Sequence, residues 1–406
     1  MEPQHQYWAR LRSLLWQPPR PHGNQLPGRV VGHLELFYDL VVVVLVAQAA
    51  QHLAAHLSGR GVGEFAAVFT LVWIAWFNGT LHHELHGRED ARGRIMFLLQ
   101  ILALVPLGAF IPEAGGARGR AFAADAAVLF TVVALLWFLA ARGDRQPEYR
   151  RPSRRYVTGT ALCAAVLAAS ALLPAGPRVL VWGLTGVAYL AGLAAVTATA
   201  SPLQAGALIM TDSLIERFGL LIIIVLGETV TGVVSGLAHS AVDALTLLVA
   251  PIAVVAGFGA WWTYFDFAGQ RPPRRGRPAT LVWMVTHLPL TGAVAGMGAA
   301  MVSLIQHAHA TRTPTATAWG LCTGAAVVLA STALLITCLH PWGHRPGRDR
   351  PLFLTCIGAS VGCLGIGIAR PTPLVLVLAV VVLFGIPWAF AVAYRVTHDD
   401  TAPLGP

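Results

Sequence analysis

Long apolar runs, separated by short loops that carry most of the charges, restrict this chain to one class of protein. Residues 179–200 and 371–394 contain no Asp, Glu, Lys or Arg. Each run exceeds the roughly 20 residues that a helix needs to cross a bilayer. Only 12% of all residues are charged, against roughly 25% in soluble domains. The sequence therefore predicts an integral membrane protein rather than a soluble enzyme.

Twelve apolar runs, bounded by Gly, Pro and charged residues, predict twelve transmembrane helices. They cover 34–57, 64–83, 95–112, 121–141, 156–174, 178–199, 215–238, 243–267, 280–307, 316–339, 352–369 and 373–395. The predicted fold class is all-α, a polytopic helical bundle. The loops are too short to hold a catalytic domain, and the chain has no Walker motif, no GxGxxG after a strand and no GxSxG elbow. ATP-driven transport by this chain alone is therefore not expected.

All 28 basic residues are arginines, and their distribution predicts the orientation of the chain. With the N-terminus inside, 22 arginines lie in the cytoplasm and six lie outside. Cytoplasmic loops of membrane proteins carry such an excess, so both ends are predicted inside, in the inner (plasma) membrane. The net charge of +9 thus reflects topology, and no basic amphipathic domain suggests binding to nucleic acid.

The first 32 residues are predicted as a cytoplasmic segment. They lack the apolar core of roughly 7 to 15 residues that marks a signal peptide. A short helix at the inner membrane surface fits them better, with these apolar and basic residues: Trp8, Arg10, Leu11, Arg12, Leu14, Leu15 and Trp16. All five cysteines fall in predicted spans without a CxxC pair, so disulfides, zinc and other cofactors are not expected.

A weak internal repeat divides the predicted bundle. "ELFYDLVVVVLVAQ" from Glu35 resembles "ERFGLLIIIVLGET" from Glu216, and "PLGA" at Pro106 resembles "PLTGA" at Pro289. Six helices per copy would give two parallel repeats. The predicted parts are 1–32, a first repeat at 33–200, a second at 201–396 and a cytoplasmic tail at 397–406. Chance similarity between apolar helices is the alternative.

Carboxylates inside spans are candidate functional groups, because a charge there costs roughly 2.5 to 3.5 kcal/mol. Glu35 and Asp39 lie four residues apart on one face of the first span. They could bind a cation or share a proton. Alternatively, they stabilise the helix N-terminus and pair with an arginine.

The seventh predicted span carries Glu216, Arg217 and Glu228. Arg217 and Glu228 share a face about 16 Å apart, too far to touch. Glu228 lies near mid-membrane and is the best single candidate for proton or cation coupling. Alternatively, it is protonated and hydrogen-bonded between helices. Gly232 and Gly236 form a GxxxG pattern that predicts close helix packing.

Further polar residues lie near the ends of other predicted spans. Asp266 could form a salt bridge with Arg217 or with arginines of the next loop, and His287 could relay protons or act as a hydrogen-bonded packing residue. His82 and His86 lie four residues apart but do not form HExxH, and no third ligand is evident. They are weak metal candidates, and no metal site is predicted.

The two quoted helices resemble the two signature helices of the bacterial low temperature requirement A (LtrA) family, and "WWTYFDFAG" from Trp261 resembles a third family segment. The resemblance spans nearly the whole chain, although the last four helices contribute little. Tyr38 stands where the family commonly has Phe. The family name records a cold-growth phenotype, so the resemblance implies a bacterial membrane protein and no reaction. The positions that match the signatures are Glu35, Phe37, Asp39, Glu216, Arg217, Phe218, Gly219, Gly227 and Glu228.

Three functions are compatible with these residues. The first is a transporter or channel for an ion or small solute, with a polar site formed by Glu35, Asp39, Arg217, Glu228 and Asp266. The second is a membrane-embedded enzyme acting on a lipid or isoprenoid through His82, His83 and Glu84. The third is a non-catalytic scaffold in which buried charges serve assembly. The expected partners are membrane lipids and an ion or small solute; no feature supports or excludes a homo-oligomer.

Overall fold

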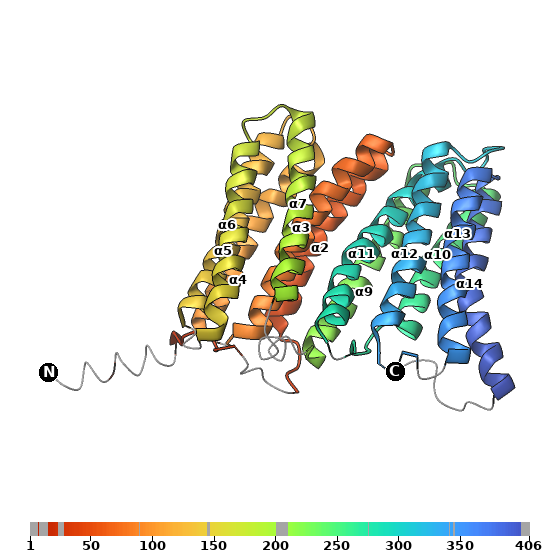
Figure 1. Cartoon of the computed structure of the whole chain (residues 1–406). Helices are drawn as coiled ribbons and strands as arrows, with labels where there is room; N and C mark the ends of the chain where they lie inside the picture. The colour runs from red at the N-terminus through yellow and green to blue at the C-terminus, as the bar shows by residue number, and fades with distance from the viewer. Residues whose placement is uncertain are drawn as a thin grey trace. The chain divides into compact units, whose positions relative to one another are not determined.

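The protein is all-helical throughout the residues that the computed structural model describes, which are 7, 15–22, 28–88, 90–143, 147–199, 210–274, 276–340, 342–343 and 346–398. Each of the twelve predicted spans corresponds to one long helix (Figure 1), so the predicted fold class is confirmed. The helices are α2 (His33–Ala55), α3 (Gly59–His86), α4 (Ala91–Phe110), α5 (Gly119–Gly143), α6 (Pro147–Ser170), α7 (Ala175–Thr199), α9 (Asp212–Ala238), α10 (Ala244–Phe267), α11 (Arg277–Gln306), α12 (Thr315–Cys338), α13 (Pro346–Ala369) and α14 (Pro373–His398). A 3-10 turn, η1 (Ile111–Glu113), extends α4.

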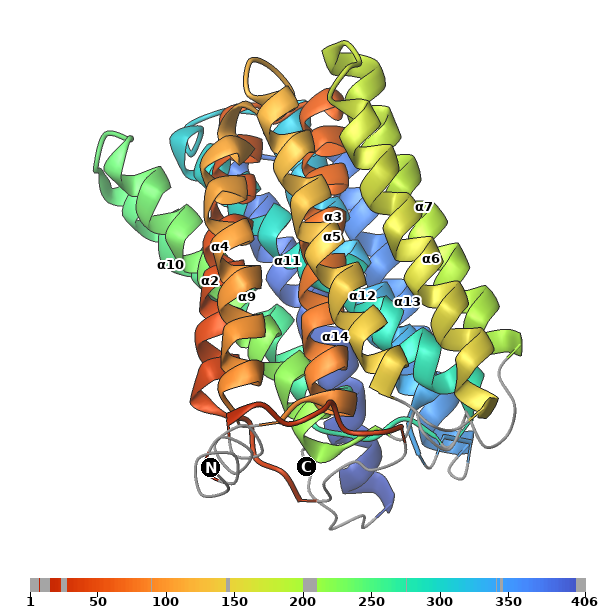
Figure 2. The same ribbon diagram turned by 90° about the vertical axis from the view of Figure 1, so that its left-hand side faces the viewer.

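Eleven of the described helices are long and apolar enough to cross a membrane, and the protein is a polytopic helical membrane protein. The exception is α6, because four arginines occupy its first turns: Arg150, Arg151, Arg154 and Arg155. Its apolar part, 156–170, is about 22 Å long, whereas all 24 residues measure about 36 Å. This helix lies along both α5 and α7 (Figure 2).

The chain divides into two compact units. The first contains Met1–Leu45 and Ala67–Arg217, and the second contains Val46–Ala66 and Phe218–Pro406. The predicted boundary between repeats, at residues 200 and 201, lies outside the described residues, and the internal repeat stays a prediction. Most of the predicted N-terminal surface helix also lies outside them.

A buried polar network joins four helices inside the first unit. The Asn78 side chain in α3 accepts hydrogen bonds from the Trp137 indole of α5 (3.0 Å) and the Tyr156 hydroxyl of α6 (2.7 Å). Its amide nitrogen donates to the Tyr189 hydroxyl of α7 (2.8 Å) and to the Ile74 carbonyl (2.7 Å). Satisfied polar groups of this kind hold helices together where lipid offers no competing partner.

Glycines bring α9 and α11 into backbone contact inside the second unit. A Cβ atom on Gly232 would lie 2.0 Å from the Gly298 carbonyl oxygen, and one on Gly298 would lie 2.4 Å from the Glu228 carbonyl oxygen. Gly236 packs against Ile305, one turn further along. The GxxxG pattern therefore marks close helix packing, as predicted.

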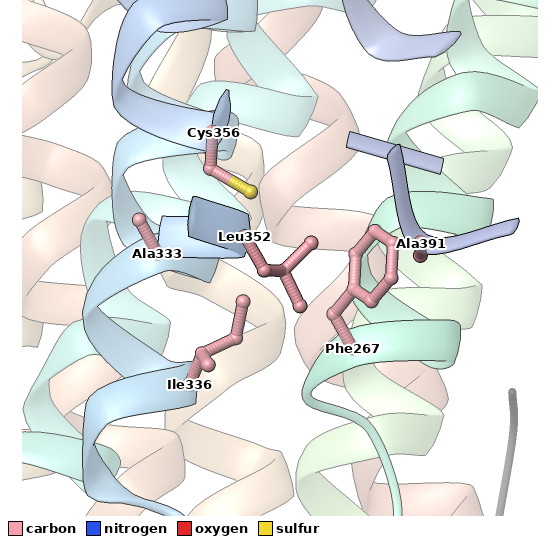
Figure 3. Close-up of a cluster of buried hydrophobic side chains, with 6 residues drawn as sticks. All are labelled: Phe267, Ala333, Ile336, Leu352, Cys356 and Ala391. Carbon is pink, nitrogen blue, oxygen red and sulfur yellow. The ribbon is translucent and has the colours of Figure 1, made fainter. Parts of the chain in front are cut away.

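An apolar cluster closes another part of the second unit (Figure 3). Phe267 at the end of α10 lies beside Leu352 of α13 and Ala391 of α14 in this view. Two α12 residues, Ala333 and Ile336, complete the cluster together with Cys356. The thiol of Cys356 is buried and free, so this cysteine acts as a small apolar residue.

Aspartates begin two of the helices. Asp90 accepts a hydrogen bond from the Gly93 amide (2.8 Å) at the start of α4. Asp243 accepts from the Thr246 amide (2.9 Å), and the Thr246 hydroxyl accepts from the Asp243 amide (2.9 Å), which completes a capping box for α10. The Thr246 amide and His309 lower the Asp243 pKa to about 2. The cap is therefore ionised throughout the physiological pH range.

Replacing Gly298 with Leu should separate α9 from α11, because the added side chain meets the Glu228 backbone. We expect the free energy of unfolding to fall by about 1–3 kcal/mol, as for other overpacked sites. The measurement is a lower thermal midpoint in detergent. Gly296→Leu is the matched control, since nothing lies within 4 Å of a Cβ atom at Gly296. Equal midpoints for the two variants would contradict the close contact.

Candidate functional site

Three charged side chains from two distant parts of the sequence meet in the first unit. Glu35 and Asp39 project from the same face of α2, and Arg217 projects from the second turn of α9. Arg217 donates to Asp39 through Nη2 (2.5 Å) and Nε (3.4 Å), and to Glu35 Oε1 through Nη1 (3.2 Å). All three residues are at most 1% exposed. The structure thus joins Arg217 to the acidic pair that the sequence predicts on α2.

Arg29 and Glu84 extend these contacts into a longer network. The Arg29 guanidinium forms an ion pair with Glu35 and another with Glu84 Oε2 (2.8 Å). Glu84 also accepts hydrogen bonds from the hydroxyls of Thr211 and Ser213, each at 2.8 Å. The chain entering α2, the end of α3 and the start of α9 are therefore tied together. We call Arg29, Glu35, Asp39, Glu84 and Arg217 the ion-pair network.

Hydrogen bonds compensate the buried charges of the ion-pair network. Asp39 accepts from the Trp76 indole (2.8 Å), and Glu35 accepts from the Gly32 amide (2.9 Å). Burying charges is costly unless their partners are well placed, and removing one partner of a buried pair typically costs 3–5 kcal/mol. The network can therefore hold its helices firmly only while every member is present.

Arg20 lies next to this network, in the segment of residues 15–22, which we call the N-terminal strap. Its guanidinium donates to the carbonyls of Glu84 (3.0 Å) and Gly87 (2.6 Å) at the end of α3, where the helix dipole favours a cation. Burial and the charge of Arg29 lower the Arg20 pKa. Arg88 also holds the strap, donating to the Pro18 carbonyl (2.8 Å) and to Gln17 Oε1 (2.9 Å).

A small pocket lies beneath the N-terminal strap. Its walls include Gln17, Gly79, His83 and Gln100, and it encloses about 30 Å³, enough for one or two water molecules. His83 Nε2 lies 3.9 Å from Glu35 Oε1. Water in this pocket would lie beside His83, which separates it from Glu35 of the ion-pair network.

Glu228 differs from the carboxylates of the ion-pair network. It lies on α9 in the second unit and is 7% exposed. No hydrogen bond or ion pair reaches its carboxylate from the described residues of the chain. Glu216, on the same helix, is exposed. Glu228 is therefore a carboxylate placed inside a span without a compensating charge in the described structure.

The remaining predicted residues of the second unit have local partners. Asp266 accepts a hydrogen bond from the Trp262 indole (2.7 Å), and Arg271 donates to its backbone carbonyl (3.1 Å). Neither contact is the predicted salt bridge of its carboxylate. His287 is fully buried and donates through Nδ1 to the Trp283 carbonyl (2.7 Å), so Nε2 accepts from the Tyr264 hydroxyl (3.0 Å). This arrangement is that of a hydrogen-bonded packing histidine.

His82 and His86 lie on α3 with their ring centroids 5.6 Å apart. His86 Nδ1 donates to the Arg20 carbonyl (2.7 Å), and both rings pack edge-on against Trp137. Among the described residues, no group of three or more His, Cys, Asp or Glu side chains could hold a metal ion.

Sequence reasoning missed the residues that complete the ion-pair network. In the sequence, Arg29 lies within the predicted cytoplasmic segment 1–32, and Glu84 follows His82 and His83. The need of two buried carboxylates for nearby cations was the signal that could have indicated Arg29. Ser213 and Trp76 gave no signal, because single hydroxyl and indole groups are common near the ends of spans.

Comparison with known families finds a match over most of the chain. The model of the family described as "Bacterial low temperature requirement A protein (LtrA)" matches residues 30–392. The match covers four members of the ion-pair network (Glu35, Asp39, Glu84 and Arg217), begins one residue after Arg29 and reaches into α14. No match was found among the curated proteins.

Replacing Arg217 with Gln should leave Glu35 and Asp39 buried without their shared cation. We expect the free energy of unfolding to fall by about 3–5 kcal/mol. The measurement is a large drop in the thermal midpoint or a loss of monodisperse protein in detergent. The control is Glu216→Gln, one residue away and exposed, which should change stability by less than about 0.5 kcal/mol. A stable Arg217→Gln protein would show that the ion-pair network does not hold the fold.

Proposed function

Because the chain belongs to the bacterial low temperature requirement A protein (LtrA) family, whose name specifies no reaction, we propose a function from the charged residues themselves. The protein moves an ion or small solute across the membrane. Glu228 is the group that takes up and releases a proton or a cation during this transport. The observation that carries the proposal is the burial of Glu228 without a partner among the described residues.

The contrast between Glu228 and the ion-pair network supports this assignment. Glu35, Asp39 and Glu84 each have an arginine within ion-pair distance, so a transported cation would have to compete with a fixed one. Glu228 has no such competitor among the described residues. A proton or a monovalent cation would neutralise the Glu228 carboxylate. An ionised carboxylate without a counter-ion has a high free energy within the membrane. Binding and release of a proton or cation at Glu228 would therefore change the free energy of holding α9 in its position in the membrane.

The packing around Glu228 offers a route from binding to movement. Its backbone contacts Gly298 of α11, and Gly232 packs one turn further along α9. Backbones in such close contact cannot shift independently. A change of charge at Glu228 would thus be felt first at the contact between α9 and α11.

In this proposal the ion-pair network has a structural role. It fixes the start of α9 to α2 and α3, which leaves the remainder of α9 as the part that can respond to Glu228. The enzyme hypothesis gains no comparable support, because Glu84, one of its three residues, is already engaged with Arg29 and with the hydroxyls of Thr211 and Ser213.

We further propose the orientation given by the arginines, with both ends in the cytoplasm and the protein in the bacterial inner membrane. Twelve crossings require α6 to span. Its length of about 36 Å is sufficient, and its four N-terminal arginines would lie in the headgroup region on the cytoplasmic side. Arginine side chains near helix ends commonly extend to the interface in this way.

Proton or Na⁺ entry into proteoliposomes tests the transport role of Glu228. We expect full-length protein to increase entry of one of these ions over protein-free liposomes, and Glu228→Gln to lower entry at least tenfold, because an amide cannot exchange a proton or balance a cation. Glu216→Gln should keep the wild-type rate. Wild-type rates in the Glu228→Gln protein, with unchanged chromatographic behaviour, would exclude Glu228 from transport.

Reporter fusions test the orientation. Green fluorescent protein fused after Pro406 should fluoresce, and alkaline phosphatase at the same position should be inactive, because the tail is cytoplasmic. Alkaline phosphatase fused after Ser240 should be active. An active phosphatase at the C-terminus would overturn the proposed topology and the span assigned to α6.

A further inference from the structure

A groove runs between α10 and α14 in the second unit. It encloses about 150 Å³ and is lined almost entirely by apolar and aromatic residues. Phe258 and Trp262 of α10, which are 48% and 38% exposed, form one wall with Gly259. Phe384, Gly385 and Trp388 of α14 form the other wall. Its exposed aromatic side chains place this groove on the lipid-facing surface of a membrane helix.

Gly385 creates the opening. No atom lies within 4 Å of a Cβ atom at this position, so a larger side chain there would enter free space in the groove. Gly259, opposite, already packs against Phe384, where a Cβ atom would lie 2.9 Å from the Phe384 Cβ. The two helices are therefore in close contact at Gly259 and leave open space at Gly385.

Charged residues lie at one end of the groove. The groove residue Trp262 donates through its indole to Asp266 (2.7 Å), and Arg271 donates to the Asp266 carbonyl. Arg395 follows Trp388 by seven residues, two helical turns, and so lies on the same face of α14. The aromatic groove therefore ends near two cations, Arg395 of α14 and Arg271 of the loop that follows α10.

Arginines act on one another among the described residues of this region. Burial and the charges of Arg348 and Arg395 lower the Arg271 pKa, and Asp266 opposes them. Arg348 lies 3.4 Å from Asp349, and Asp266 is the described carboxylate that acts on both Arg271 and Arg395. An additional anion at this end of the groove would be stabilised.

We infer that the groove between α10 and α14 binds one acyl chain of an anionic phospholipid, whose phosphate lies at the end marked by Arg271 and Arg395. Basic pockets between transmembrane helices are the sites at which anionic lipid headgroups bind. The volume of about 150 Å³ is smaller than the roughly 300–1,000 Å³ of sites for compact drug-sized ligands, so the groove takes a segment of one narrow chain. The inference does not depend on the proposed transport function.

Charge complementarity distinguishes this occupant from a second protein helix. A packed helix would favour small residues along the whole contact, whereas this groove presents Phe258, Trp262 and Trp388. A zwitterionic lipid would fill the apolar part equally well but would leave the arginine end without an added anion.

Native mass spectrometry of the delipidated full-length protein tests the site, with phosphatidylglycerol and phosphatidylcholine of identical acyl chains as probes. We expect one phosphatidylglycerol to bind at least about fivefold more tightly than phosphatidylcholine, the effect of about one arginine near an anionic headgroup. Gly385→Leu should abolish this high-affinity binding by filling the groove.

Two further variants separate the acyl chain from the headgroup. Gly358→Leu, on α13 and also facing open space, should bind as wild type does. Arg395→Gln should lose the preference for phosphatidylglycerol, and Arg395→Lys should restore it. Equal binding of the two lipids, or unchanged phosphatidylglycerol binding by Gly385→Leu, would overturn the inference, as would formation of a dimer that Gly385→Leu disrupts.

Discussion

The pairing of Arg217 with Asp39 and Glu35 is the interaction on which the first unit depends. The two acids lie about 180 residues before the arginine in sequence, and their shortest contact is 2.5 Å. In a low-dielectric surrounding each charge would be costly alone, and together they are tolerable only because several hydrogen bonds satisfy them at once. Arg29 and Glu84 repeat the same solution at the end of α3. Folding of α2, α3 and the start of α9 is therefore coupled by charge rather than by apolar packing alone.

Glu228 is a buried carboxylate that lacks this compensation by ion pairs and hydrogen bonds among the described residues. It is buried on α9 like Arg217, yet the described residues offer it no cation and no hydrogen-bond donor. A chain that compensates Glu35, Asp39 and Glu84 so thoroughly has no structural need for an isolated carboxylate in a span. The proposal of ion coupling at Glu228 follows from this difference between two sets of carboxylates in one protein.

The sequence predicted the helices well because the need to cross lipid imposes the same length and apolar character on each of them. All twelve predicted runs are helical, and the errors lie at their ends, as in α3, which continues from residue 83 to His86, and in α6, which begins at Pro147 instead of residue 156. Charged residues mark the ends of a span in sequence, whereas a helix can extend several turns beyond the lipid. The charged turns of α6 therefore belong to its helix.

Side-chain partners were harder to predict. Pairing across 178 residues depends on which helices are neighbours, and apolar periodicity does not specify that. The apparent repeat shows the same limit: Phe37 and Phe218 align, but Phe37 is 53% exposed and Phe218 is fully buried. Glu35 and Glu216 align as well, yet Glu35 is buried in the ion-pair network and Glu216 is exposed. Aligned residues of the same type therefore do not lie in equivalent environments.

A double-mutant cycle between Arg217 and Asp39 tests the central claim that the buried charges of the ion-pair network are tolerated only together. The measurement is the free energy of unfolding in detergent for wild type, Arg217→Gln, Asp39→Asn and the double variant. We predict that the double variant is less destabilised than the sum of the single variants, with a coupling energy of about 2 kcal/mol or more, within the range for groups in direct contact. Additive losses would contradict the claim and would leave the ion-pair network as a coincidence of packing.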